Sequence, residues 1–189
     1  MYLLAHLAFG AVTADAARRL RRGVRVDFRW ILLGTILPDL VDKPLGFALG
    51  LSGRIWTHTA LASVALTLLG LAWMRRGSSA ATWLAVGSWT HLVLDRMWDL
   101  PVTLLYPLFG FAFPPADRSL LSYLLVLVTD PVVWGGEIVG GVVLFAMAWR
   151  YGVHDWPSVR SFLAGGDVAR SSGARRRARG SGWPRSKDP

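Results

Sequence analysis

Histidine and aspartate residues stand inside the most apolar stretches of this 189-residue sequence. Six of them are of interest: His6, Asp39, Asp42, His58, His91 and Asp95. Asp39 and Asp42 are three residues apart, and His91 and Asp95 are four apart, so each pair would share one face of a helix. Three carboxylates and three imidazoles without sulfur form a ligand set suited to Zn²⁺, and also to Mn²⁺ or Fe²⁺. The residue types therefore predict a divalent metal site, with Zn²⁺ as the first choice.

Composition indicates that this chemistry lies in a membrane. Of the residues 53% are hydrophobic and 17% are charged, and mean hydropathy is +0.39. The sequence contains no Cys, Asn or Gln, which excludes disulfides, thiolate metal sites, cysteine nucleophiles and N-glycosylation acceptors. An ionised aspartate at the centre of a bilayer costs about 2.5–3.5 kcal/mol, so such a residue usually faces a partner or a water-filled cavity.

Five apolar runs must position these side chains, and they span residues 1–17, 30–49, 57–74, 80–98 and 121–149. Each run approaches or exceeds the roughly 20 residues that a membrane-spanning helix needs. We expect an all-α, multi-pass membrane bundle of about five helices in residues 1–155. A soluble helical protein would instead show polar stripes at helical spacing. In residues 61–73 the only polar side chains are those of Ser63 and Thr67. Gly46-x-x-x-Gly50 and Gly136-x-x-x-Gly140 fit close helix packing.

Arginine predicts the orientation, since loops rich in Lys and Arg remain cytoplasmic. The first loop carries six arginines and the third carries two, whereas Arg54 and Arg118 are the arginines of the second and fourth loops. The N-terminus is then outside, the C-terminus is cytoplasmic, and all six polar residues fall in the outer half of a cell membrane.

The segment 156–189 is predicted to be a basic cytoplasmic tail, disordered from about Gly165 because it is rich in Gly, Ser and Arg. Its arginines fit a solvated topology determinant, and they also fit contact with anionic lipid headgroups. No folded nucleic-acid motif accompanies them, so the lipid bilayer is the expected partner.

The motifs together resemble the membrane-bound metal-dependent hydrolase family, also described as inner-membrane-associated putative hydrolases. The resemblance rests on an early His, Gly34-x-x-x-Pro38-Asp39-x-x-Asp42, Thr57-His58-Thr59 and His91-x-x-x-Asp95. Many relatives carry Pro-Asp-x-Asp, whereas the second aspartate here is one residue later.

More distantly, the ligand order resembles that of zinc-dependent phospholipases C and the related single-strand nucleases. This resemblance implies the metal ligands His6, Asp39, His58, His91 and Asp95. Those enzymes add a later His-x-x-x-Glu pair, for which Asp130 and Glu137 are the candidates to stand in. We therefore expect Glu137 to act in catalysis.

The expected activity is metal-assisted hydrolysis of a phosphoester or another ester near the membrane, with Asp42 accepting a proton from water. Other interpretations remain open. The same cluster would serve a protein that binds or transports a cation. A scaffold would use its buried polar residues for helix packing, with Asp42 paired to Lys43 or an arginine and His6 simply packed.

The orientation is testable with a topology reporter fused after Met74 or after Trp149. Both fusions should report the cytoplasm, because arginines follow each position closely. An extracytoplasmic signal at either position would overturn the predicted orientation.

Overall fold

The computed structural model describes residues 3–20, 26–116, 125–126 and 128–165, and helices dominate this part of the chain. The elements with defined bounds are α1 (Leu3–Leu20), α2 (Phe28–Leu49), the 3-10 turn η1 (Trp56–His58), α3 (Ala60–Met74), α4 (Ala80–Leu94), the 3-10 turn η2 (Met97–Asp99), α5 (Pro101–Leu104), α7 (Pro131–Arg150) and α8 (Trp156–Gly165). The predicted all-α class is confirmed.

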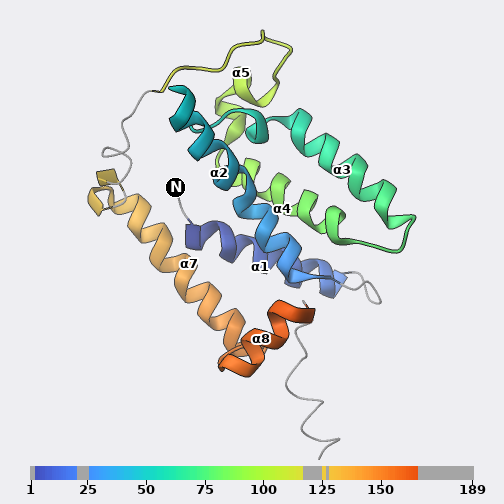
Figure 1. Cartoon of the computed structure of the whole chain (residues 1–189). Helices are drawn as coiled ribbons and strands as arrows, with labels where there is room; N and C mark the ends of the chain where they lie inside the picture. Colours follow the sequence, from blue (N-terminus) through green and yellow to red (C-terminus); the bar gives the residue numbers. More distant parts are fainter. Residues whose placement is uncertain (1–2, 21–25, 117–124, 127, 166–189) are drawn as a thin grey trace, which may run out of the picture.

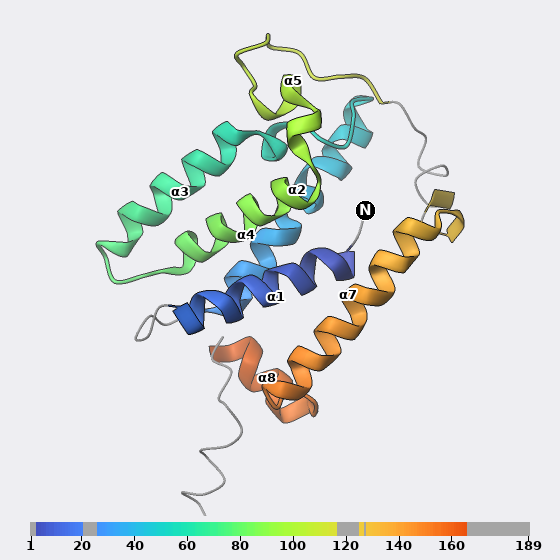
Figure 2. The ribbon, with the colours of Figure 1, turned by 180° about the vertical axis from the view of Figure 1, so that it is seen from behind.

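Contacts connect the five longer helices in the order α3, α4, α2, α1 and α7, and α2 runs diagonally across α4 and α1 (Figure 1). Helix α2 packs against both α4 and α1, α3 packs against α4, and α7 packs against α1. The reverse view shows α8 next to the end of α7, far from α5 and η1 (Figure 2).

Helices α2 and α4 cross with their backbones in close contact. A Cβ atom on Gly34 would lie 2.2 Å from the carbonyl oxygen of Leu84, and one on Gly87 would lie 2.3 Å from that of Ile31. Side chains larger than hydrogen are therefore excluded at both positions. The crossing also brings neighbouring turns together, so Thr35 and Asp39 on α2 approach His91 on α4.

The two small-residue motifs have different outcomes. Gly140 packs on α1, where an added Cβ would lie 2.4 Å from the backbone nitrogen of Ala5, so the predicted close packing at this position is confirmed. Gly46 instead packs on the backbone of Ser52, and Gly50 ends α2 in the left-handed conformation at φ 65°. The Gly46-x-x-x-Gly50 motif therefore shapes the end of α2 and the loop after it.

Among the described helices, α7 alone is long and apolar enough to cross a membrane, with a mean hydropathy of 1.7. Only 11% of its apolar window is buried, unlike the core helix of a soluble protein. Helices α3 and α4 have 15 residues each, about 22 Å, against a hydrocarbon core of about 30 Å. Helices α1 and α2 carry charged residues within their length. The five-span bundle is therefore not confirmed beyond α7.

Several predicted runs are divided in the structure. His58 lies in η1 and α3 starts at Ala60, while Asp95 forms the C-cap of α4 before η2. Helix α7 begins at Pro131, because the Asp130 side chain accepts hydrogen bonds from the backbone N–H groups of Val132 and Val133 and so forms an N-cap. These boundaries place His58 and Asp95 where helices begin and end.

Large apolar side chains cover the outer surface of α7 and α3. Val132, Val139 and Phe145 of α7 are 72%, 64% and 68% exposed, and Leu61 and Leu68 of α3 are 55% and 62% exposed. Apolar area of this extent marks a surface that contacts another apolar phase. The hydrocarbon region of a lipid bilayer is such an apolar phase.

The start of the predicted tail is helical, since α8 occupies residues 156–165. Two carbonyl groups near its end, those of Leu163 and Ala164, accept hydrogen bonds from Arg29 Nη1 at 2.8 Å. The disorder predicted from about Gly165 falls on residues 166–189, outside the described residues.

Replacing Gly87 with alanine should lower the free energy of unfolding by about 1–3 kcal/mol, because the new methyl group meets the backbone of α2. The measurement is thermal unfolding in detergent. Gly135→Ala is the matched control, since its added Cβ meets nothing within 4 Å and alanine favours helix. Equal unfolding temperatures for the two variants would contradict the tight crossing.

Candidate metal centre

His91 is held by α2 although it belongs to α4. Its Nδ1 lies 2.8 Å from the backbone carbonyl of Thr35, and the side chain is fully buried. A carbonyl oxygen only accepts, so Nδ1 carries the proton and Nε2 presents a lone pair. The close crossing of α2 and α4 supplies this contact.

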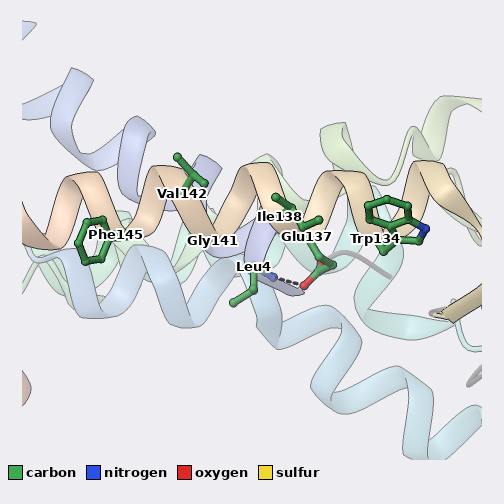
Figure 3. A pocket seen from close by; sticks show the side chains of 7 residues that line it. All are labelled: Leu4, Trp134, Glu137, Ile138, Gly141, Val142 and Phe145. Carbon is green, nitrogen blue, oxygen red and sulfur yellow. Dashed lines mark hydrogen bonds between the residues drawn. The ribbon is translucent and has the colours of Figure 1, made fainter.

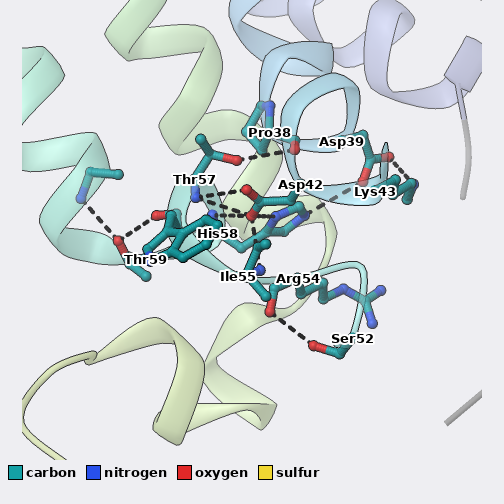
Figure 4. A network of polar contacts seen from close by, with 12 residues as sticks. Pro38, Asp39, Asp42, Lys43, Ser52, Arg54, Ile55, Thr57, His58 and Thr59 are labelled. Carbon is teal, nitrogen blue, oxygen red and sulfur yellow. Dashed lines mark hydrogen bonds and ion pairs between the residues drawn. The ribbon is translucent and has the colours of Figure 1, made fainter. Parts of the chain in front are cut away.

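His58 is held by the buried carboxylate of Asp42 (Figure 4). The distance from His58 Nδ1 to Asp42 Oδ2 is 2.7 Å, and both side chains are fully buried. Asp42 also accepts backbone hydrogen bonds from Ile55 at 2.9 Å, Thr57 at 3.0 Å and His58 at 3.1 Å. One carboxylate on α2 thus fixes both the backbone of η1 and the ring that it carries.

The threonines on either side of His58 complete this connection. Thr57 Oγ1 donates to the carbonyl of Pro38 at 3.0 Å, which ties η1 to α2 a second time. Thr59 Oγ1 donates to the carbonyl of Trp56 and accepts from the backbone of Ala62, so it caps α3. Each residue of Thr57-His58-Thr59 therefore has a separate structural task.

Asp39 and Asp95 bring two carboxylates to the histidines. Asp39 Oδ1 lies 3.5 Å from His58 Nε2 and 3.9 Å from His91 Nε2, and Asp95 Oδ2 lies 3.9 and 4.0 Å from the same two nitrogens. Asp39 Oδ1 is buried and accepts no hydrogen bond from the part of the chain that the structure describes. This Asp39 oxygen, which lacks a hydrogen-bond donor among the described residues, faces the two imidazoles.

The four side chains each offer one ligand atom within 4.8 Å of the others. The two Nε2 atoms are only 3.1 Å apart. With both Nδ1 positions donating, neutral rings would direct two lone pairs at each other. In a tetrahedral zinc site with Zn–N bonds of about 2.0–2.1 Å, ligand atoms lie about 3.3 Å apart. The geometry of Asp39, His58, His91 and Asp95 therefore fits a divalent cation.

His6 lies beside this group on α1. Its Nε2 is 3.3 Å from Asp95 Oδ1, and its ring centroid is 4.5 Å from that of His91. The side chain is buried, at 3% exposure. His6 therefore contacts the carboxylate oxygen opposite the one that approaches His58 and His91.

Glu137 contacts a different part of the molecule. It lines an apolar groove between α7 and the start of α1, with a volume of about 510 Å³ (Figure 3). Its Oε2 accepts a hydrogen bond from the backbone of Leu4 at 2.9 Å. Asp130, the other candidate from the fifth apolar run, caps α7. Glu137 thus contacts the start of α1, and Asp130 contacts the start of α7.

Asp42 is placed differently from a base exposed to water. Both of its oxygens accept hydrogen bonds from η1 and the residue before it, and its side chain is fully buried. A carboxylate that orients the remote nitrogen of a metal-ligating histidine is a common arrangement in metalloproteins. The contacts of Asp42 match that arrangement.

Two groups at the site were not predicted from the sequence. The Thr35 carbonyl is backbone, so residue type does not reveal it. Arg54, an isolated arginine of the second loop, donates from Nε to Asp95 Oδ2 at 2.9 Å. Its isolation within an apolar region, three residues before Thr57, was the available hint.

Comparison with known proteins places the chain in a family. The family described as YdjM inner membrane protein matches residues 1–160, and the chain belongs to it. No curated protein and no solved structure matches significantly. The family description supports an inner-membrane location and association with the lipid bilayer.

Asp42→Ala should lower the free energy of unfolding by about 3 kcal/mol or more, because several buried donors lose their acceptor at about 1–3 kcal/mol each. The control Asp99→Ala removes an equal charge from an exposed ion pair with Arg96. It should change the free energy of unfolding by less than about 0.5 kcal/mol. Chemical unfolding in detergent measures both. Similar losses would show that Asp42 has no special structural role.

Proposed function

We propose that this inner membrane protein is a metal-dependent hydrolase that cleaves a phosphoester or another ester close to the membrane. The observation that carries the proposal is the pair of buried imidazoles whose Nε2 atoms lie 3.1 Å apart beside two carboxylates. Nitrogen and oxygen ligands without sulfur favour Zn²⁺, with Mn²⁺ and Fe²⁺ as the other choices.

Asp39, His58, His91 and Asp95 hold the cation in this proposal, and His6 supports Asp95. The bound cation supplies a water of lowered pKa and polarises the ester oxygen. The Thr35 carbonyl and Asp42 keep the two rings oriented, so that both Nε2 atoms remain available. Asp42 acts here as a positioning residue, since its oxygens are already occupied by donors.

The proposed orientation puts the metal centre on the extracytoplasmic side. Arginines at the end of α1, the start of α2 and the end of α7 belong to the end of the molecule near α8, whereas η1 and α5 lie at the other end (Figure 1). The cytoplasmic end would then meet anionic lipid headgroups through its arginines, including those of the tail.

Elemental analysis of the purified protein tests the metal site. Wild type should contain a divalent metal, and His91→Ala and Asp95→Ala should lose it, because each removes a ligand. Asp42→Asn should weaken metal affinity by about 10–100-fold. The control is His154→Ala, whose ring lies against Trp149 outside the cluster. Metal content unchanged in both ligand variants would contradict the site.

Turnover separates the hydrolase from a cation carrier. The metal-loaded protein should hydrolyse a chromogenic phosphodiester or carboxylic ester in detergent, and the chelated protein should not. In proteoliposomes the same preparation should move no Zn²⁺. Cation flux without ester hydrolysis would favour a carrier and overturn the proposed activity.

A further inference from the structure

Two cations stand directly beside the carboxylates of the proposed metal centre. Lys43, one helical turn after Asp39 on α2, pairs with Asp39 Oδ2. Arg54, in the loop before η1, pairs through Nε with Asp95 Oδ2 at 2.9 Å. Figure 4 shows the side chains of Lys43 and Arg54 on the same side of the polar network around Asp42 and His58. They reach the centre from different segments of the chain.

Side-chain exposure is greatest at the two cations. The side chains of His58 and His91 are 0% exposed, those of Asp95 and Asp39 are 7% and 15% exposed, and those of Lys43 and Arg54 are 21% and 40% exposed. Access therefore increases from the imidazoles through the carboxylates to the two cations. Lys43 and Arg54 therefore mark the most accessible side of the centre.

The charges at the centre favour an anion there. Asp39, Asp42 and Asp95 carry three negative charges, and Lys43 and Arg54 carry two positive charges. Adding one divalent cation to this set leaves one positive charge in excess. A net charge in surroundings of low dielectric is costly without a partner of opposite sign. While the metal-bound water is neutral, a monoanionic substrate balances this charge, whereas a neutral carboxylic ester does not.

We propose that Lys43 and Arg54 recognise a phosphate group, so that the substrate of this centre is a phosphoester. The inference rests on the metal-dependent function proposed above. A phosphate diester is a monoanion, and its tetrahedral oxygens can meet the metal and two cations at once. Arginine and lysine are both common phosphate partners, the first through its planar fork and the second as a point charge.

Inorganic phosphate is the probe, and the visible spectrum of protein loaded with Co²⁺ is the readout, because it reports ligands on the metal rather than at the surface. Titration should shift the cobalt bands of wild type. At equal cobalt content, Lys43→Met and Arg54→Gln should each weaken the phosphate response about tenfold or more, as charge-assisted hydrogen bonds are lost. Arg96→Gln is the matched control, because it removes an arginine from an exposed ion pair with Asp99.

The outcomes distinguish this inference from the function on which it rests. Cobalt that binds without any response to phosphate, or a response equal in all variants, overturns phosphate recognition and leaves the metal centre standing. Wild type that binds no cobalt overturns both. A weakened response in the Lys43 and Arg54 variants, with Arg96→Gln unchanged, supports the inference.

A second pair of samples identifies the source of the phosphate. Cobalt-loaded protein is placed in dodecyl maltoside micelles, which contain no phosphate, with and without phosphatidic acid, and inorganic phosphate is then added. A band shift with phosphatidic acid alone assigns the site to a lipid headgroup, and a shift only with inorganic phosphate assigns it to a soluble phosphoester. Bands that respond to neither overturn phosphate recognition.

Discussion

The buried carboxylate of Asp42 sets the geometry on which the candidate site depends. Its oxygens accept hydrogen bonds from the backbone of Ile55, Thr57 and His58 and from the His58 ring. A carboxylate buried without donors would be strongly destabilising, so these four contacts must form together. The loop after α2, the turn η1 and the start of α3 are thereby fixed to α2. The position of His58 is a consequence of that connection.

The second half of the site comes from the crossing of α2 and α4. Gly34 and Gly87 allow the two backbones to approach, and the Thr35 carbonyl then reaches His91 Nδ1. Both imidazoles are thus anchored through Nδ1, one by a carboxylate and the other by a carbonyl, which is the outer arrangement seen around metal-ligating histidines. The anchors leave the two Nε2 atoms facing one space from different helices.

Part of this arrangement could be predicted from the sequence. The spacing of His91 and Asp95 brings them to one face of a helix, and the structure places their Nε2 and Oδ2 atoms 4.0 Å apart. The different tasks of Asp39 and Asp42 could not be predicted, because they depend on the path of the loop after α2. Spacing within one helix says nothing about which neighbour each carboxylate meets.

Helix positions were predicted better than membrane crossings. Apolar runs indicate where helices lie, but a boundary depends on local contacts such as the Asp130 cap, and a crossing depends on length and on the charges within the helix. Hydropathy predicts a span at each of the five runs because it averages over turns and caps. The structure shows α7 as the one clear candidate among the described helices, while the more polar α1 and α2 support the site.

An apolar exterior around a polar centre explains why the charges of the site are paired. Exposed apolar side chains on α7 and α3 fit a surrounding lipid phase, in which an isolated buried charge is costly. Asp39 has Lys43, Asp95 has Arg54, and Asp42 has four donors. A divalent cation is therefore not required to neutralise the aspartates one by one. Its binding adds charge to a set that is already largely compensated, so the loaded centre attracts an anion.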